Sequence, residues 1–294
     1  MELKKVFEPG KIGNLELKNR LVVSAMSSHM GNPDGTPNET VNAYLVAKVK
    51  GGWGLVFTED LGITVDAGSD PVVGSLWNDD QVPAWTETVR QVHAAGGLMG
   101  AQLYHAGRQR SLKAYDTYPV APSALKEPAV PYVPRALTVE EIHEMVDAFA
   151  KTAKLLQDAG VDGVEIHAVH EGYLLDQFAI SMFNRRDDEY GGSLENRCRF
   201  IDEIIAGIRA KLGRYPISVR ICGDEMTDEP GFLTLEDGLE IGRHLEAQGI
   251  DCINISNGSS WNGNANCEPF SYTPGWKKHV AKAFKEALSI PVIA

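Results

Sequence analysis

Two imidazoles and a phenol stand close together in the segment His167-Ala-Val-His170-Glu-Gly-Tyr173, at the end of an apolar run. Titratable side chains at the end of a buried strand are typical of active sites. On a continuous strand His167 and His170 would point to opposite faces, so we place His170 in the loop that follows. The pair could then donate hydrogen bonds to a carbonyl oxygen or a developing oxyanion. Tyr173, whose phenol is protonated at neutral pH, is a candidate proton donor.

Two other apolar runs end in residues suited to binding a polar ring. Gln102 begins the segment Gln-Leu-Tyr-His-Ala-Gly-Arg, and its amide offers both a donor and an acceptor to the imide edge of a pyrimidine-like ring. Arg220, in Val-Arg-Ile-Cys, would place a cation where negative charge develops. The alternative for Arg220 is an ion pair with Glu59 or Glu165.

A repeated strand–helix unit must position these residues. In segments such as Gly160-Val-Asp-Gly-Val-Glu-Ile166, a glycine ends a helix and a short apolar run follows. This periodicity predicts about seven strands separated by about six helices. Capping residues predict that helices begin near Thr36, Thr138, Ser193 and Thr234. The strands are expected at residues 20–25, 53–58, 98–103, 161–167, 216–222, 250–255 and 290–294.

Alternating strands and helices with no return strand indicate an α/β protein with a parallel sheet, either a (β/α)₈ barrel or a doubly wound open sheet. Polar residues end several of the runs, and a barrel brings many strand ends to one mouth. The first strand is not followed by G-x-G-x-x-G, which argues against a dinucleotide-binding sheet. We therefore predict a single (β/α)₈ TIM-barrel domain over residues 1–294. It is incomplete, because the chain ends before an eighth strand.

Composition excludes several classes of partner. The formal charge of -12 argues against nucleic acid and anionic membranes. The four cysteines form no C-x-x-C pair, and the histidines form no H-x-H or H-E-x-x-H pattern, so we predict no metal site. The amino-terminal segment has no apolar signal region, and no later run is long enough to cross a bilayer. These features predict a cytoplasmic protein.

In combination, these segments resemble the Old Yellow Enzyme family, the NADH:flavin oxidoreductase / NADH oxidase family of FMN-dependent ene-reductases. The match covers nearly the whole chain, and its pieces occur in the family's order. The pieces are Leu17-Lys-Asn-Arg-Leu-Val-Val23, Gln102-Leu-Tyr-His-Ala-Gly-Arg108, the His167 segment, Tyr190-Gly-Gly-Ser-Leu-Glu-Asn-Arg197 and Arg220.

The resemblance implies FMN bound over the carboxyl ends of the strands, with NADH or NADPH as reductant. Gln102 would bind the pyrimidine edge of the flavin, and Arg220 would lie near N1 and C2=O. The cofactor-binding residues implied are Ala25, Met26, Ser27, Glu59, Asp60, Gln102, His167 and Arg220.

The implied reaction is reduction of the C=C bond of an α,β-unsaturated carbonyl compound, an enone or a dienoyl compound, by ping-pong hydride transfer through flavin N5. His167 and His170 look like the pair that binds the carbonyl oxygen, and Tyr173 looks like the proton donor. Two alternatives remain. One is a metal-dependent barrel hydrolase that uses His167, His170 and a carboxylate such as Glu59, and the other is an inactive barrel fragment that cannot retain FMN.

Two local departures refine the resemblance. The extra Glu171 before Gly-Tyr is similar to the 2,4-dienoyl-CoA reductase and bile-acid-oxidoreductase-like branch, whose members carry an iron–sulfur cluster and a second flavin domain after the barrel. We therefore expect either a homo-oligomer or a longer form that contains those parts. Ser24-Ala-Met-Ser27 stands where many members have Pro-Met-Thr or Pro-Met-Cys, so redox tuning by a cysteine is not available there.

Overall fold

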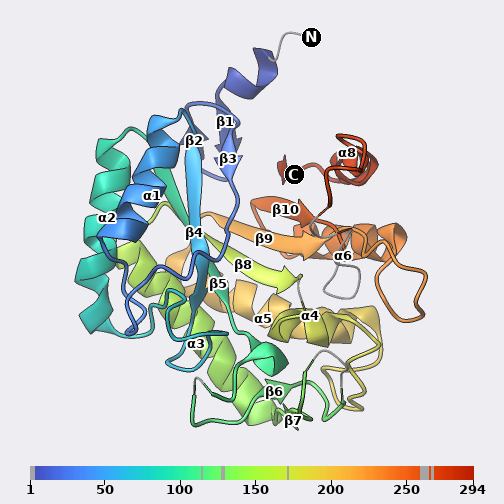
Figure 1. Ribbon diagram of the computed structural model, residues 1–294. Helices are drawn as coiled ribbons and strands as arrows, with labels where there is room; N and C mark the ends of the chain where they lie inside the picture. The colour runs from blue at the N-terminus through green and yellow to red at the C-terminus, as the bar shows by residue number, and fades with distance from the viewer. Residues whose placement is uncertain (1–3, 114, 127–129, 171, 259–264, 266–267) are drawn as a thin grey trace.

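A curved sheet of seven parallel strands forms the centre of the molecule in a computed structural model that describes residues 4–113, 115–126, 130–170, 172–258, 265 and 268–294 (Figure 1). The strand order is β11-β10-β9-β8-β5-β4-β3. Their bounds are β3 Val22–Val23, β4 Leu55–Gly62, β5 Leu98–Tyr104, β8 Gly163–Val169, β9 Ile217–Cys222, β10 Cys252–Ser256 and β11 Val292–Ile293. The predicted incomplete (β/α)₈ barrel is confirmed. Within the described residues, β3 and β11 each pair with the sheet on one side only.

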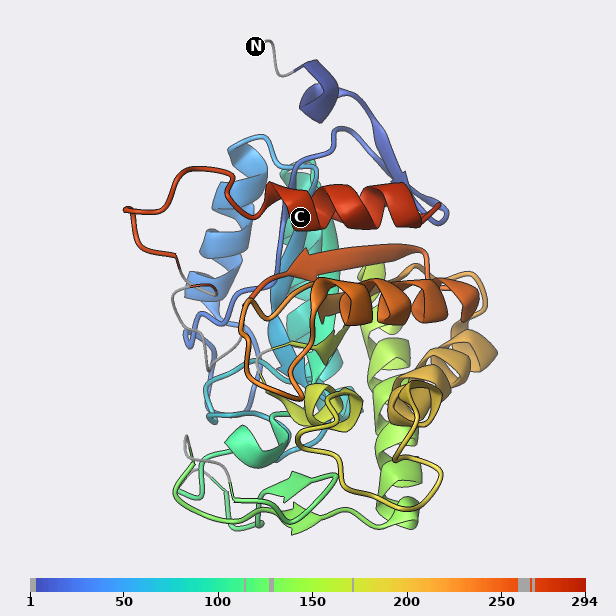
Figure 2. The same cartoon turned by 90° about the vertical axis from the view of Figure 1, so that its right-hand side faces the viewer.

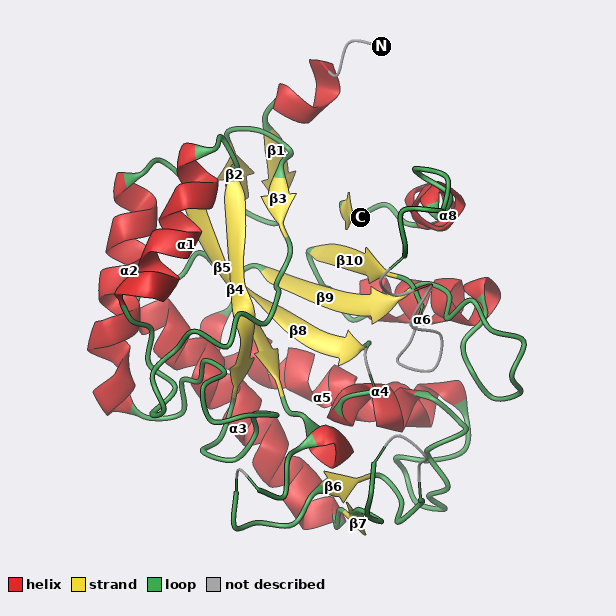
Figure 3. Cartoon of the chain, viewed as in Figure 1, coloured by secondary structure: helices red, strands yellow, loops and turns green. Residues whose placement is uncertain are grey.

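Helices cover the outside of the sheet (Figure 3). They pack apolar faces against it, and the resulting core includes Trp85, Phe149 and Phe200, each no more than 1% exposed. The helices α6 and α8 lie side by side next to β10 (Figure 2). None of the helices that the structure describes combines the length and the apolar character needed to cross a membrane. The bounds are α1 Glu39–Lys50, α2 Val82–Ala94, α3 Val139–Asp158, α4 Leu174–Ala179, α5 Leu194–Leu212, α6 Leu235–Ala247 and α8 Lys278–Ala287.

The helix caps confirm three of the four predicted starts and correct the fourth. The side chain of Asn38, not of Thr36, caps α1 by accepting hydrogen bonds from the backbone N–H groups of Thr40 and Val41. The hydroxyl of Thr36 instead donates to Asp34 at 2.6 Å, within the preceding turn. The Thr36 hydroxyl, which the capping pattern assigned to the helix, is thus bonded to the carboxylate of Asp34. The confirmed caps are Thr138, Ser193 and Thr234.

Short elements outside the main sheet were not predicted. The hairpin of β1 (Gly10–Ile12) and β2 (Leu15–Leu17) buries Ile12 and Leu17 in a cluster with Leu55 and Phe57. Strands β6 (Val120–Ala121) and β7 (Arg135–Ala136) pair in parallel within the excursion between β5 and α3. Pieces of two or three residues are too short to give a periodic signal. Three short 3₁₀ turns complete the description: Lys4–Phe7, Asp79–Gln81 and Gly107–Gln109.

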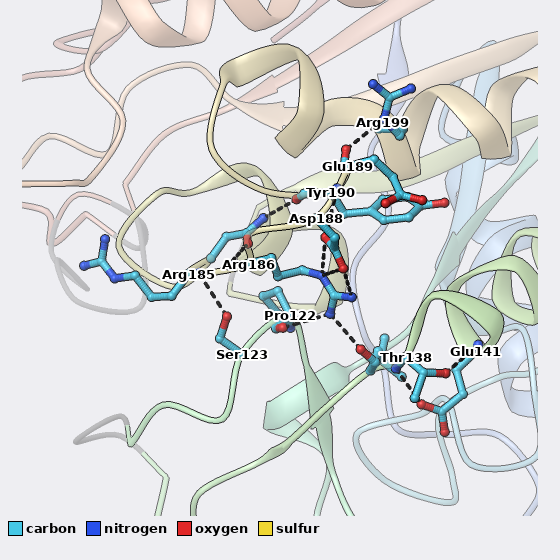
Figure 4. Close-up of polar contacts among 12 residues, drawn as sticks. Pro122, Ser123, Thr138, Glu141, Arg185, Arg186, Asp188, Glu189, Tyr190 and Arg199 are labelled. Atoms are coloured by element: carbon cyan, nitrogen blue, oxygen red, sulfur yellow. Dashed lines mark hydrogen bonds and ion pairs between the residues drawn. The ribbon is translucent and has the colours of Figure 1, made fainter.

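Arg186 fastens the β6–β7 excursion to the loop before α5 (Figure 4). Its Nη1 donates to the carbonyl oxygens of Pro122 at 3.0 Å and Leu137 at 2.7 Å. Its Nη2 lies 2.5 Å from the carboxylate of Asp188, and the Arg186 side chain is only 8% exposed. The neighbouring side chain of Arg185 points away from this cluster (Figure 4). One guanidinium therefore joins segments about sixty residues apart in the chain.

Candidate active site

A cavity of about 720 Å³ lies at the carboxyl ends of the strands. It brings together nine of the ten residues predicted to act in catalysis or cofactor binding. These nine are Ala25, Met26, Ser27, Asp60, Gln102, His167, His170, Tyr173 and Arg220. The lining also contains residues for which the sequence predicted no catalytic or binding role, namely Val22, Val23, Ser24, Tyr44, Lys48, Trp53 and Ser256.

Two irregularities in the strand register aim the polar side chains. Between Phe57 and Asp60, β4 has one more residue than the facing part of β5, where Asp60 is the partner of Gln102. Between His167 and Val169, β8 has one more residue than β9. An extra residue in one strand turns the side chains that follow it. Both shifts occur beside the cavity. There the side chains no longer alternate regularly between the two faces of the strand.

Glu59 is the predicted residue that does not line the cavity. Its carboxylate accepts the backbone N–H groups of Ser28 at 2.6 Å, His29 at 3.2 Å and Gly74 at 3.2 Å. The register shift in β4 brings Asp60 to the cavity and leaves Glu59 facing the loop after β3. Glu59 therefore holds the segment that follows Ser27.

Asp60 is a carboxyl group in a dry environment, only 3% exposed. The hydroxyl of Ser27 hydrogen-bonds to its Oδ1. Burial raises the pKa of Asp60 to about 6, although the hydrogen bond from Ser27 opposes the change. This group therefore changes charge close to neutral pH inside the cavity.

Gln102 rests on a polar cluster inside the barrel. Its Nε2 donates to Glu165 at 2.8 Å, and Glu165 is completely buried. Glu165 also accepts hydrogen bonds from Ser218 at 2.9 Å and Asn254 at 3.0 Å. Because the NH₂ group of Gln102 faces Glu165, its carbonyl oxygen is directed away from that cluster. No local sequence pattern indicates this cluster, because Glu165, Ser218 and Asn254 lie on three separate strands.

The histidine pair is hydrogen-bonded to itself and to Ser256. Nε2 of His167 lies 3.0 Å from Nδ1 of His170, and Nε2 of His170 lies 2.5 Å from Oγ of Ser256. The two histidines are 5% and 4% exposed. Burial, and next the charge of Arg220, hold the pKa of both rings well below 6.5. Both rings are therefore neutral at physiological pH.

Arg220 supplies the fixed positive charge of the cavity. Its Nη1 donates to the carbonyl oxygen of Ala25 at 2.9 Å, while its Nε is buried and has no partner among the described residues. Within the described part of the chain no ion pair joins Arg220 to Glu59 or Glu165, so the structural alternative for this residue is not supported. An unsatisfied buried guanidinium nitrogen is costly, and an anionic or carbonyl-rich ligand would satisfy it.

Tyr173 closes one side of the cavity beside the histidines. Its ring packs edge-on against His167, with 5.0 Å between ring centres, and against Tyr104 at 5.1 Å. Gly172, at φ +73°, turns the chain into α4, and its N–H donates to Asp176 at 2.6 Å. Glu171, on which the branch assignment depends, lies outside the described residues.

The cavity suits a planar heterocycle with an imide edge. Its volume lies within the ordinary range of small-molecule sites. The unpartnered Nε of Arg220 and the amide of Gln102 offer donors and an acceptor to carbonyl and N–H groups, as FMN presents them. Among the described residues, no cluster of three histidine, cysteine or acidic side chains could hold a metal ion. Among these residues the hydrolase alternative therefore has no ligand set, and Glu59, the carboxylate named for it, is bonded to backbone N–H groups.

Known proteins are similar to this chain in both sequence and fold. The NADH oxidase of Thermoanaerobacter brockii is 36% identical over 291 residues, which cover 98% of this chain and 44% of that protein. The cinnamate reductase of Clostridium sporogenes is 36% identical over 319 residues, with 99% and 47% covered. The old yellow enzyme homologue from Zymomonas mobilis superposes with a TM-score of 0.82 at 28% identity, over 98% of this chain and 81% of that one.

The chain thus spans less than half the length of these two curated relatives. A sequence model for the NADH:flavin oxidoreductase / NADH oxidase family matches residues 5–294. The barrel fold and this family match together confirm the resemblance to the Old Yellow Enzyme group. The chain belongs to the NADH:flavin oxidoreductase / NADH oxidase family.

Proposed function

We propose that this chain forms the FMN-binding barrel of an NAD(P)H-dependent oxidoreductase that reduces the C=C bond of α,β-unsaturated carbonyl compounds. One observation carries the proposal. The candidate oxygen-binding pair His167 and His170 and the candidate acid Tyr173 line the same cavity as Gln102 and Arg220. The family match supports FMN as the cofactor and NADH or NADPH as the reductant.

Gln102 and Arg220 would hold the ring of the cofactor. The amide of Gln102 is kept in one orientation by Glu165, so it meets the imide edge with a fixed acceptor. The unpartnered Nε of Arg220 would donate to a ring carbonyl, and its charge favours an anion in the cavity. When bound, FMN supplies the hydride for the substrate after NADH or NADPH has reduced it.

His167 and His170 would bind the carbonyl oxygen of the substrate. A hydrogen bond to this oxygen withdraws electron density from the conjugated C=C bond and stabilises negative charge as it develops. Because both rings are neutral, the pair provides donors without a permanent charge of its own. The nearby cation of Arg220 supplies long-range stabilisation of the same negative charge.

Tyr173 would deliver the proton that completes the reduction. Its ring lies against His167, so its phenol enters the cavity from the side of the oxygen-binding pair. A phenol retains its proton at neutral pH and can transfer it to a carbanion in a water-poor cavity. The N–H of Gly172 donates to Asp176, and this hydrogen bond fixes the backbone position from which the Tyr173 side chain extends.

Replacing His167 and His170 together with alanine tests the proposal. We expect the rate of 2-cyclohexenone reduction to fall by at least about a hundredfold, because the substrate oxygen loses its donors. FMN binding, measured by quenching of flavin fluorescence, should remain. His279→Ala, which changes an exposed histidine, is the matched control. Unchanged enone turnover in the double variant, with FMN bound, would exclude the assigned role.

Tyr173→Phe separates proton delivery from oxygen binding. It keeps the ring against His167 but removes the hydroxyl, so kcat should fall while KM for the enone changes little. The cinnamate reductase relative suggests cinnamate as a second probe beside 2-cyclohexenone. Assays with NADH and NADPH in turn identify the reductant. A parallel loss of FMN binding would instead assign Tyr173 to the cofactor.

A further inference from the structure

Ser256 is the last residue of β10, and its side chain lines the cavity beside the histidine pair. Its Oγ lies 2.5 Å from Nε2 of His170, whose Nδ1 lies 3.0 Å from Nε2 of His167. The three side chains form one continuous hydrogen-bonded chain. We propose that Ser256 is a positioning residue, whose hydroxyl holds His170 with its proton on Nδ1 and so makes His170 a donor toward a substrate oxygen. This inference rests on the proposed function for its catalytic consequence.

Proton counting limits the arrangements that this chain can adopt. Each neutral imidazole carries one proton, on either Nδ1 or Nε2. Burial and the charge of Arg220 keep the pKa of both rings low, so an imidazolium is not available as an alternative donor. His170 therefore presents either an N–H or a bare nitrogen to His167, and the opposite nitrogen meets Ser256.

Binding a carbonyl oxygen through both rings selects one of these states. The two nitrogens that face each other are Nε2 of His167 and Nδ1 of His170. For both to donate to one oxygen, His170 must have its proton on Nδ1 and a bare Nε2. A bare Nε2 is an acceptor, and the hydroxyl of Ser256 is the donor beside it. With the proton on Nε2 instead, His170 would turn a lone pair toward the substrate oxygen.

The surroundings fix Ser256 and leave His167 adaptable. The backbone oxygen of Ser256 accepts the N–H of Gly223 at 2.8 Å, and Ser256 pairs with Cys222 in the ladder between β10 and β9. The backbone that bears the Ser256 hydroxyl is therefore fixed by hydrogen bonds to its neighbours. By contrast, Nδ1 of His167 is buried and has no hydrogen-bond partner among the residues that the structure describes. None of those residues holds the proton of His167 on that nitrogen, so among them this ring is free to carry its proton on Nε2 when a substrate oxygen arrives.

The first test reads the tautomer directly and needs neither cofactor nor substrate. The whole chain is labelled with ¹⁵N-histidine, and long-range ¹H–¹⁵N spectra distinguish the Nδ1–H from the Nε2–H form. The signal of His170 is identified by its loss in His170→Gln. We expect the Nδ1–H form in the parent, a several-fold shift toward Nε2–H in Ser256→Ala, and recovery in Ser256→Thr. Ser289→Ala, which changes a serine near α8, should leave the spectrum unchanged.

Two results overturn the proposal. One is a parent in which His170 carries its proton on Nε2. The other is a His170 tautomer that is the same in Ser256→Ala as in the parent. Circular dichroism of each variant shows that it is folded before its spectrum is interpreted. A chain that reduces no enone would defeat the proposed function and leave the tautomer result intact.

The second test measures the catalytic consequence with FMN bound. Ser256→Ala should lower kcat/KM for 2-cyclohexenone on the order of tenfold, which is the loss of about one net hydrogen bond. Ser256→Thr should restore most of this loss. The dissociation constant of FMN and the rate of flavin reduction by NADH or NADPH should not change. Weaker FMN binding with an unaltered enone step would place Ser256 at the cofactor and would refute the positioning role.

Discussion

The amide of Gln102 is held from inside the barrel by Glu165, whose oxygen lies 2.8 Å from the Gln102 nitrogen. Glu165→Gln should therefore weaken the site even though it changes no atom of the cavity lining. A glutamine at this position can donate as well as accept, so it no longer selects one orientation of the Gln102 amide. It also leaves Ser218 and Asn254 competing for fewer acceptors.

We expect Glu165→Gln to lower the free energy of unfolding by about 1 to 3 kcal/mol, as for other disrupted buried hydrogen bonds. FMN affinity should fall as well. Urea unfolding and flavin titration measure the two effects. Ser218→Ala is the matched control, because it removes one donor to Glu165 without touching Gln102. Equal FMN affinities in the parent and in Glu165→Gln would contradict the orienting role.

Asp60 should make stability depend on pH between about 4 and 6. Burial raises its pKa in the folded state from 3.8 to about 6, so the folded chain binds a proton that the unfolded chain releases. Ionisation at higher pH therefore destabilises the fold. One pKa unit corresponds to about 1.4 kcal/mol, so the penalty at pH 8 is about 2 to 3 kcal/mol.

Asp60→Asn should remove this penalty. The variant should be more stable than the parent at pH 8, and the difference should shrink toward zero at pH 4. Urea unfolding at the two pH values measures it, with Asp228→Asn as a control at an exposed aspartate. Burial lowers the pKa of His167 and His170, so their protonation in acid lowers the free energy of unfolding. This effect is common to the variant and the parent, so the difference between them reports Asp60 alone. A difference that does not vary with pH would refute the assignment.

Arg186 and Arg185 are adjacent arginines for which we predict opposite outcomes. Arg186→Lys cannot bind Asp188 and two carbonyl oxygens at once, so it should destabilise the fold by about 2 to 3 kcal/mol. Arg185→Lys should change stability by less than about 0.5 kcal/mol, since the Arg185 side chain is exposed. Thermal unfolding of both variants tests this. Similar melting temperatures for the two would contradict the clamp seen in Figure 4.

Gly207 and Gly100 differ in the space available for an added Cβ atom. A Cβ added at Gly207, in the middle of α5, would lie 3.4 Å from Ala150, which is an ordinary contact. Gly207→Ala should therefore stabilise the chain by about 0.5 to 1 kcal/mol, because alanine loses less backbone entropy in a helix. A Cβ at Gly100 would lie 2.4 Å from the ring of Phe57. Gly100→Ala should destabilise by about 1 to 3 kcal/mol. Chemical unfolding of both variants checks the signs.

The sequence was sufficient to predict the barrel and most of the candidate site. Gln102, His167 and Arg220 each lie near the carboxyl end of a strand. The carboxyl ends of parallel strands meet at one mouth whatever the details of packing. The convergence of these residues therefore follows from topology. The choice between Glu59 and Asp60 does not follow, because it depends on an extra residue in β4 that packing decides.

Relationships across strands were also beyond the sequence. Glu165 and Ser256 act on Gln102 and His170 from distant positions in the chain, and no local spacing connects them. The N-cap of α1 shows a smaller limit of the same kind. Thr36 satisfied the capping pattern, yet its hydroxyl binds Asp34, and Asn38 lies where the helix begins. Local patterns rank such alternatives poorly when two polar partners compete.

The hydrogen bond between Arg220 and the carbonyl oxygen of Ala25 spans 195 residues, and the bond between Asn254 and Ser24 spans 230. Contacts of such high sequence separation are entropically expensive and generally form late. The strands β4, β5 and β8 can pair while the cavity is still open at both of these bonds. The side of the cavity formed by Ser24 and Ala25 can therefore be joined to its opposite side only after β9 and β10 have been synthesised and have entered the sheet.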